Sequence, residues 1–233
     1  MTAFQYHPEI LQRYPTTVGG IILASGMRGG PTPPPLAEAF LAEQGAVKTR
    51  IGATPLSELP QLAAWRSVLR GFGVDPTAYR VAPEALLRRL TKKGDIPSIN
   101  TLVDIGNLVS IRYALAVAMV DTRAVTGPIT VKFADGSENF TPLFETQVEH
   151  PEPGEVVFSD DTGMLVARRW CWRQADQSAA RDDTASAIVT IEGHHAEARA
   201  DIERATADLL ALLKEYAGGE FTTALLGVDR LGV

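Results

Sequence analysis

Residues 96–107 read IPSINTLVDIGN, and this stretch decides the fold more than any other. Ser98 is a suitable N-cap, because its side-chain oxygen can accept a bond from the first helical turn. We therefore expect a helix from Ile99 to about Tyr113. At helical spacing one stripe of it is mostly polar: Asn100, Asp104, Asn107 and Ile111. The stripe beside it is apolar: Leu102, Ile105, Val109 and Tyr113.

Two interpretations of this helix stay open. It either lies in the core and offers amides and a carboxylate to a cleft, or turns its polar stripe to water and to neighbouring turns. Gly106 favours the first, because glycine inside a helix costs up to about 1 kcal/mol relative to alanine. Close approach of a partner or a ligand would account for that cost.

The flanking sequence predicts helices before this stretch and strands after it. A strand is expected at 18–24 and a loop at 26–35, followed by helices at 36–43, from a Ser57 cap through Leu69, and from Pro83 to a closing Gly94. Short runs rich in β-branched residues predict further strands at 116–120, 129–133, 155–158, 164–168 and 187–191. Asp161-Thr162-Gly163 marks a hairpin, and a last helix is expected at 196–217. This order predicts an α+β fold.

Length and composition limit the class of protein. The 233 residues suffice for one large domain, and 45% hydrophobic with 21% charged residues is an ordinary globular balance. No apolar run is long enough to span a bilayer, and the N-terminus lacks the pattern of a signal peptide. A single cysteine, Cys171, excludes an intramolecular disulfide. We expect a cytoplasmic protein with no membrane partner.

A basic run lies at the predicted end of the helix that starts near Pro83. It consists of Arg88, Arg89, Lys92 and Lys93. These residues either complement the helix dipole on a solvated surface or contact RNA phosphates. The net charge of −6 argues against strong sequence-independent nucleic-acid binding, although a local basic face remains compatible with it.

Residues 168–178 read RRWCWRQADQS and combine aromatic, cationic and hydrogen-bonding groups. Strand alternation would place Trp170 and Trp172 on one face, with Arg169, Cys171 and Arg173 on the other. Tryptophan and arginine together suit base stacking and phosphate contact. The alternative is an apolar wall with surface arginines.

Glu192 follows the strand predicted at 187–191 and precedes Gly193-His194-His195. A carboxylate at a strand end can position a water or bind an ammonium group, and it can equally be a first-turn acid of the last helix. Adjacent histidines point to different sides, so we expect no metal site and no cofactor.

Taken together, residues 96–107 resemble the signature of the B3/B4 domain, the editing module of the phenylalanyl-tRNA synthetase β subunit. Three further features are similar to the same family. They are the spacing between Asn107 and Asp121, the 154–161 segment with the arginine-tryptophan run after it, and the 184–192 strand. The resemblance covers about 57–216 and implies a β/β/α layered domain with N-terminal helices and a long C-terminal helix. From this resemblance we expect residues 1–233 to form a single domain with an N-terminal extension of about 1–50.

The resemblance implies roles for particular residues. In the synthetase the domain hydrolyses tyrosine wrongly esterified to tRNA(Phe). Asn107 matches the asparagine that holds substrate or the attacking water, and Glu192 the glutamate that recognises the non-cognate side chain. Gly106 and Ala118 stand where many synthetases have threonine and histidine. The remaining candidate substrate-binding residues are Asn100, Asp104, Gly106, Trp172, Arg173, Gln174, Gln177 and Ser178.

The function expected from this resemblance is a trans-editing hydrolase that removes aromatic or non-protein amino acids from mischarged tRNA. Its partner would be the tRNA acceptor end or an aminoacyl-tRNA, contacted by the basic run at 88–93. We do not expect DNA to be a partner. Two alternatives remain: a non-catalytic tRNA-binding module, and a pocket protein for a free amino acid or related metabolite. The chain has no room for the catalytic core of a ligase.

Overall fold

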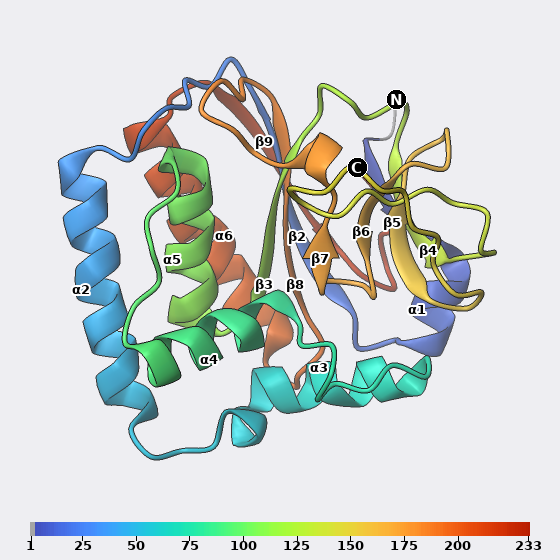
Figure 1. Cartoon of the computed structure of the whole chain (residues 1–233), viewed down its shortest axis with the longest axis horizontal. Helices are drawn as coiled ribbons and strands as arrows, with labels where there is room; N and C mark the ends of the chain where they lie inside the picture. Colours follow the sequence, from blue (N-terminus) through green and yellow to red (C-terminus); the bar gives the residue numbers. More distant parts are fainter. Residues whose placement is uncertain (1–2) are drawn as a thin grey trace.

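The computed structural model describes residues 3–233 and contains two sheets and a layer of helices (Figure 1). The helices are α1 (Pro8–Arg13), α2 (Pro34–Ile51), α3 (Pro60–Gly71), α4 (Ala82–Lys93), α5 (Thr101–Tyr113) and α6 (Ala198–Tyr216). The strands are β1 (Phe4–Tyr6), β2 (Val18–Ser25), β3 (Ala116–Asp121), β4 (Ile129–Phe133), β5 (Val156–Ser159), β6 (Leu165–Arg168), β7 (Arg173–Gln174), β8 (Ala187–Gly193) and β9 (Glu220–Leu226). One-turn 3-10 helices lie at Leu56–Glu58 and Asp176–Ser178.

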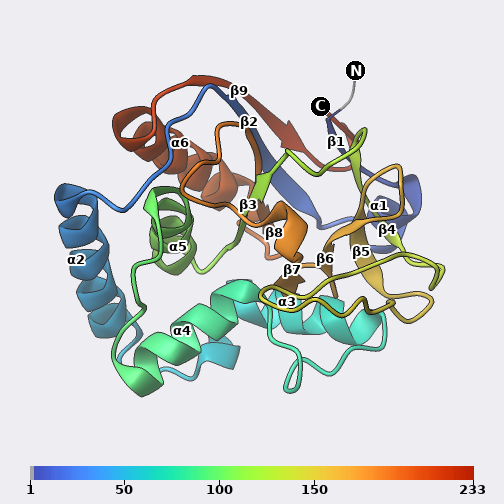
Figure 2. The same ribbon diagram turned by 45° about the horizontal axis from the view of Figure 1, so that its top comes forward.

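The two sheets pack face to face, and α2, α5 and α6 cover the outer face of one of them. One sheet has the order β1-β4-β5-β6-β7 and the other β3-β8-β2-β9. One apolar core lies between the sheets, and a second lies between the four-stranded sheet and α2, α5 and α6. Figures 1 and 2 show α3 and α4 along one end of the sheets, with α4 below α5. The predicted α+β, β/β/α layered fold is therefore confirmed.

Besides the two one-turn 3-10 helices, four elements escaped the sequence prediction: β1, α1, β7 and β9. The first three are too short to show a periodicity, and β9 has an exposed face whose pattern lacks regular alternation. The stretch 1–50 nevertheless contributes β2, which lies between β8 and β9 in the four-stranded sheet. The organisation of the chain as a single domain with an N-terminal extension stays a prediction.

Two predicted helix caps were wrong. Ser57 belongs to the short 3-10 helix, and α3 begins at Pro60 because proline fits a first turn that needs no N–H donor. Asn100 caps α5 in place of Ser98, since its Oδ1 accepts a bond of 2.9 Å from the Val103 amide. The helix expected at 36–43 is also longer, spanning Pro34–Ile51.

Other local predictions were confirmed. Gly94 ends α4 in the left-handed conformation, with φ of 93°, which a glycine adopts without a Cβ clash. The turn at 161–163 joins β5 and β6, which pair antiparallel. No helix within residues 3–233 is both long and apolar enough to cross a membrane.

Candidate functional site

Residues 169–172 form a tight turn between β6 and β7. Arg169 and Trp170 both have left-handed backbones, with φ of 46° and 59°, and such conformations cost on the order of 1–3 kcal/mol for non-glycine residues. Strand alternation stops at Arg168, so Trp170 is fully buried while Trp172 stays partly exposed. The prediction that both indoles share one face of a strand was therefore wrong.

Trp170 lies at the centre of an aromatic cluster. Its ring meets the rings of Trp65 at 5.5 Å, Tyr14 at 5.5 Å and His194 at 4.9 Å, all edge to face. Such arrangements contribute about 0.5–1.5 kcal/mol each beyond the area they bury. The turn is thus anchored to the core between the sheets.

Glu192 is a fully buried carboxylate that accepts hydrogen bonds from three side chains. The Tyr6 hydroxyl donates at 2.7 Å, the Trp170 indole nitrogen at 3.0 Å and the Cys171 thiol at 3.3 Å. Among residues 3–233 no cation pairs with it. Burial raises the pKa of Glu192 although the three hydrogen bonds oppose the shift, and burial beside Glu192 raises the pKa of Cys171. Glu192 therefore joins β1, β8 and the turn.

The two predicted catalytic residues lie on opposite sides of the four-stranded sheet. Val189 and Ile191 of β8 enter the core shared with the helices, whereas Ile188 enters the core between the sheets. By strand alternation Glu192 shares the face of Ile188, whereas Asn107 belongs to α5 on the helical side. Asn107 is partly exposed, and its amide has no hydrogen-bond partner within residues 3–233.

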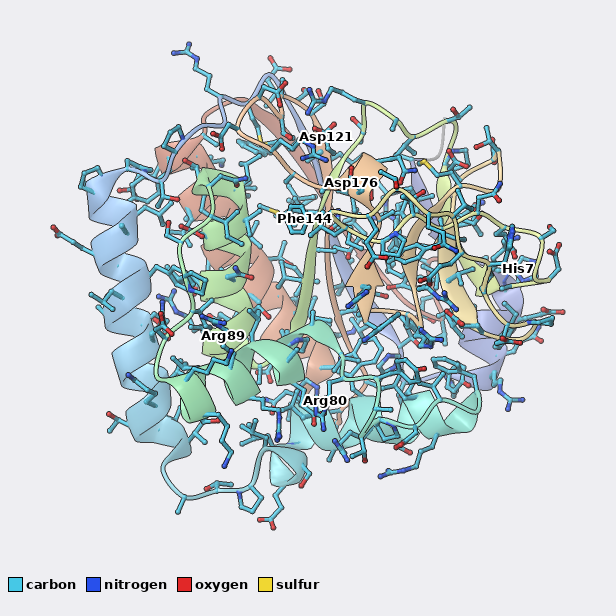
Figure 3. The ribbon with its side chains drawn as sticks, viewed as in Figure 1. His7, Arg80, Arg89, Asp121, Phe144 and Asp176 are labelled. Carbon is cyan, nitrogen blue, oxygen red and sulfur yellow. The ribbon has the colours of Figure 1, made fainter. Side chains whose placement is uncertain are left out.

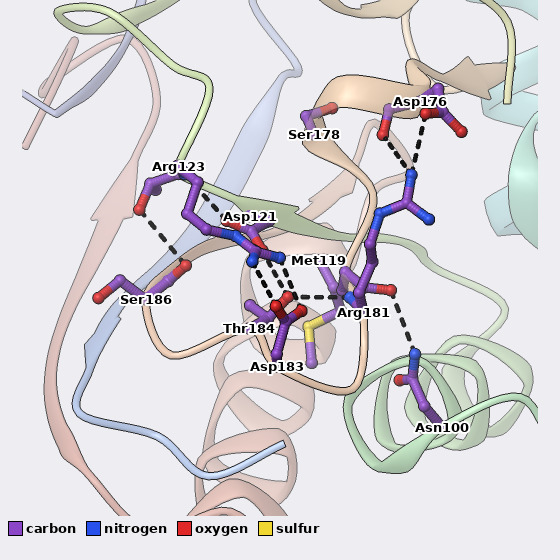
Figure 4. Close-up of polar contacts among 12 residues, drawn as sticks. Asn100, Met119, Asp121, Arg123, Asp176, Ser178, Arg181, Asp183, Thr184 and Ser186 are labelled. Atoms are coloured by element: carbon purple, nitrogen blue, oxygen red, sulfur yellow. Dashed lines mark hydrogen bonds and ion pairs between the residues drawn. The ribbon is translucent and has the colours of Figure 1, made fainter. Parts of the chain in front are cut away.

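Asn100 and Asp104 are engaged within the protein. The Asn100 amide nitrogen donates to the Ala180 carbonyl at 3.1 Å (Figure 4). The Asp104 carboxylate accepts from Thr32, Ser98 and the Ile99 amide. Both residues are buried and fasten loops to the start of α5, so the cleft-lining interpretation is not needed to explain them.

Gly106 allows α5 to approach β3 closely. A Cβ at this position would lie 3.2 Å from Cγ of Met119 and 3.6 Å from Cγ1 of Val117. The close approach predicted from Gly106 is therefore that of α5 to β3, and not that of a ligand.

Three further predicted residues fasten the 173–178 segment beside β3, the edge strand. The Gln174 amide donates to the Met119 carbonyl at 2.9 Å and to the Ser178 carbonyl at 2.6 Å. The Gln177 amide donates to the Thr141 hydroxyl at 2.8 Å. These bonds hold the segment in a fixed place next to the turn.

At the end of β3 a polar network continues this attachment (Figure 4). Asp121 accepts from the Thr184 hydroxyl and from Arg123, and Arg123 also pairs with Asp183 at 2.6 Å. Burial alone would raise the pKa of Asp121, but the bonds from Arg123 and Thr184 lower it below its ordinary value. An ionised Asp121 thus holds the 181–186 segment against β3.

A small, mainly apolar pocket lies between the turn and β3, and we call it the Trp172 pocket. It measures about 70 Å³. Its lining consists of Ala82, Val117, Ala118, Phe158, Ala167, Trp170, Cys171, Trp172, Arg173 and Gln174. Two lining residues, Trp170 and Cys171, are those that Glu192 holds.

A larger basic groove adjoins this pocket, with a volume of about 570 Å³. It is lined by Ala78, Arg80, Ala85, Arg88, Arg89, Lys92, Lys93, Trp172 and Arg173. Leu87 and Leu90 turn the opposite face of α4 into the core, which sends the cations outward. Figure 3 shows Arg80 and Arg89 on this side of the molecule.

The groove carries an excess of positive charge. Arg80, Arg89 and Arg173 each have a carboxylate at 3.5–3.8 Å, which is a loose ion pair. Within residues 3–233, Arg88, Lys92 and Lys93 form no ion pair. The structure therefore brings the four predicted tRNA-binding cations together with Trp172 and Arg173.

Two residues at this site were missed by sequence reasoning. The Arg169 guanidinium lies 3.8 Å from the ring centre of Tyr79 and 4.5 Å from that of Trp172, while Arg173 lies 4.9 Å from the Trp172 ring. Trp172 thus makes cation–π contacts with two arginines. Tyr79 stands in a loop far away in sequence, and nothing in the sequence pattern links it to Trp172.

His194 gives the buried cluster a dependence on pH. Burial, and then the neighbouring His195, lower its pKa from 6.5 to about 3. Between these values the unfolded chain binds the proton more readily, so acidification destabilises the fold. We expect the unfolding free energy to fall by up to about 1.4 kcal/mol per pH unit below pH 6.5. Denaturant unfolding at pH 5 and pH 7 measures this.

The matched variants are His194→Gln and His7→Gln. His194→Gln removes the titrating group and should flatten the slope between pH 5 and 6.5. His7 is exposed, so its replacement should leave the slope of the wild type unchanged. Equal slopes in wild type and His194→Gln would contradict the prediction.

Within residues 3–233 no three His, Cys, Asp or Glu side chains are grouped so that they could hold a metal ion. The arrangement offers instead cations, aromatic faces and a small apolar pocket.

These features define a layered α+β domain with a basic groove and a pocket at the edge of its central sheet. The B3/4 domain model matches residues 64–218, and the chain belongs to this family. Among solved structures it is similar to an N-terminal fragment of the phenylalanyl-tRNA synthetase β subunit from Pyrococcus horikoshii, with 12% identity and a TM-score of 0.49. The match covers 96% of this chain and 53% of that fragment, so the chain spans about half of its length. No curated protein matches the sequence.

Proposed function

We propose that this protein hydrolyses the ester bond of mischarged aminoacyl-tRNA. The observation that carries the proposal is that Trp172 and Arg173 line both the basic groove and the Trp172 pocket. A ligand with phosphates at one end and an amino acid at the other would fill both spaces at once. Membership of the B3/4 family supports the same interpretation.

The groove would take the backbone of the acceptor end. Six cations line it, and no carboxylate from residues 3–233 does. Phosphate neutralisation by Lys and Arg supplies most of the affinity of proteins for nucleic acid. A local basic face of this kind reconciles RNA binding with a net charge of −6.

The pocket would take the amino-acid side chain. An aminoacyl ester is already activated, so a bound water, held in place beside the carbonyl, suffices for hydrolysis without a protein nucleophile. Asn107 lines neither the pocket nor the groove, but its amide has no hydrogen-bond partner within residues 3–233 and it matches the family's asparagine, so it is our candidate for holding that water or the substrate. Glu192 would act indirectly, by fixing Trp170 and Cys171 in the pocket wall.

The test is a panel of tRNAs mischarged with different amino acids, incubated with wild type and with Ala118→Leu. Ala118 lines the pocket, so leucine would fill it. We expect at least about a tenfold loss of deacylation, because steric exclusion removes productive positioning, with affinity for uncharged tRNA unchanged. Ala118→Val provides a smaller step if leucine disturbs folding.

Ala46→Leu is the matched control, because Ala46 is exposed on α2 away from both spaces. It should deacylate like the wild type. Hydrolysis of no member of the panel, with intact tRNA binding, would favour the non-catalytic module. Stabilisation by free amino acids without RNA binding would favour a metabolite pocket.

A further inference from the structure

The loop that precedes β5 exposes an aromatic side chain next to the groove. Phe144 is 87% exposed, more than any other large hydrophobic side chain within residues 3–233. Its φ is 66°, a left-handed conformation that is unusual for a bulky residue. An exposed phenyl ring and a strained backbone at one position both oppose stability, so they call for a functional explanation.

This loop is attached to the segment that carries the pocket. Pro142 pairs with Ala175 in an isolated β-bridge, and Gln177 bonds to Thr141 at 2.8 Å. The Phe144 amide donates to Oδ1 of Asp176 at 3.2 Å. The backbone around Phe144 is thus held on both sides while its ring stays free.

The attachment places the backbone of Phe144 one residue away from a contact with the groove wall. Glu145, the next residue, lies 3.8 Å from Arg173, which lines both the groove and the pocket. Figure 3 shows Phe144 above Arg80 and Arg89 in the same view. An exposed aromatic side chain therefore directly precedes, along the chain, a residue that contacts the wall of the basic groove.

We infer that Phe144 stacks on an unpaired nucleobase of the RNA whose phosphates occupy the basic groove. A positive groove combined with an exposed aromatic side chain is the arrangement by which proteins bind single-stranded nucleic acid. The cations hold the backbone, and the ring takes a base without selecting its identity. This inference rests on the RNA-binding part of the proposed function.

The experiment compares two RNA ligands by fluorescence anisotropy: a hairpin with a single-stranded 3′ overhang and the same hairpin with a blunt end. Phe144→Ala should weaken binding of the overhang ligand about tenfold and leave the blunt hairpin unchanged. The slope of log affinity against log salt should stay that of the wild type, because stacking releases no counterions. Phe144→Trp should retain the affinity.

Leu41→Ala is the control, since Leu41 is 67% exposed on α2. It should bind both ligands like the wild type. Equal overhang affinity for wild type and Phe144→Ala would overturn the inference, as would an equal loss on the blunt hairpin. If Phe144→Ala loses a protein–protein contact and keeps its RNA binding, the ring serves an apolar protein partner. That result would also overturn the inference.

Failure of the proposed function would look different. If the wild type binds the overhang in a Phe144-dependent manner but deacylates no mischarged tRNA, the inference stands and the hydrolase proposal falls. If deacylation is observed and Phe144→Ala binds the overhang like the wild type, the hydrolase proposal stands and the inference falls. A wild type that binds neither RNA overturns the inference, while the panel of mischarged tRNAs decides the hydrolase proposal separately.

Discussion

Replacement of Glu192 with alanine is expected to lower the free energy of unfolding by about 3–5 kcal/mol. The substitution leaves the Tyr6 hydroxyl, the Trp170 indole and the Cys171 thiol without their acceptor in a buried site. Each stranded donor costs about 1–3 kcal/mol, and the cavity adds to the loss. Equilibrium denaturation in urea, followed by circular dichroism, measures the change.

Glu192→Gln is the matched variant. Its Oε1 can still accept from Tyr6 and Trp170, so we expect unfolding within about 1 kcal/mol of the wild type at neutral pH. Because burial raises the pKa of Glu192, the carboxyl group stabilises the fold below its ordinary pKa of 4.5, and this contribution is lost as pH rises through the raised value. As pH rises, the free energy of unfolding of Glu192→Gln should therefore increase relative to that of the wild type.

Deacylation kinetics show whether Glu192 positions the pocket wall or acts on the substrate. If it only positions the pocket wall, Glu192→Gln should deacylate like the wild type, with an unchanged ratio of kcat to KM. A large loss of kcat in a fully folded Glu192→Gln protein would show that the carboxylate acts on the substrate itself. The alanine variant alone does not distinguish these cases.

The second large effect is expected in the basic groove. The double replacement Arg88→Glu and Lys92→Glu should weaken tRNA binding about 100-fold at ~0.1 M salt and lower the salt slope by about 2. Both side chains line the groove and lack an ion-pair partner among residues 3–233, so their charge is available to phosphate. Titrations at several salt concentrations give affinity and slope together.

Arg199→Glu with Lys214→Glu provides the control. Both residues are exposed on α6 and outside the groove, and the change in net charge is identical. An equal loss of affinity in both double variants would mean that overall charge, not the groove, governs binding. That outcome would remove the basis for placing the acceptor end on α4.

Periodicity and turn residues allowed the α+β class to be predicted because they act locally, whereas the β/β/α layering was implied by the resemblance to the B3/B4 family. The helix at 99–113 and the turn at 161–163 follow from such signals, and so do the cations of α4. The placement of Glu192 did not follow, because it depends on Tyr6 of β1 and on Trp170 and Cys171 of the turn, two segments far apart in sequence. Only the packing of two sheets brings them together.

The turn at 169–172 was mispredicted for a related reason. Its composition favours a strand, yet tertiary contacts of Trp170 hold two left-handed residues that no local propensity would select. Likewise, Asn100 and Asp104 resemble cleft residues in sequence but hold loops in the structure. A hydrogen-bonding side chain shows its capacity in the sequence, whereas its partner is visible only in the fold.

The attachment of the pocket wall to Glu192 has a consequence for how such a protein diversifies. The cations on the outer face of α4 line a surface groove, so substitutions there can alter the choice of RNA at little cost in stability. The wall formed by Trp170 and Cys171 shares its hydrogen bonds with the centre of the molecule. A lineage that changes its amino-acid preference through this wall must therefore repack its interior, whereas changes of RNA partner remain open to single surface mutations.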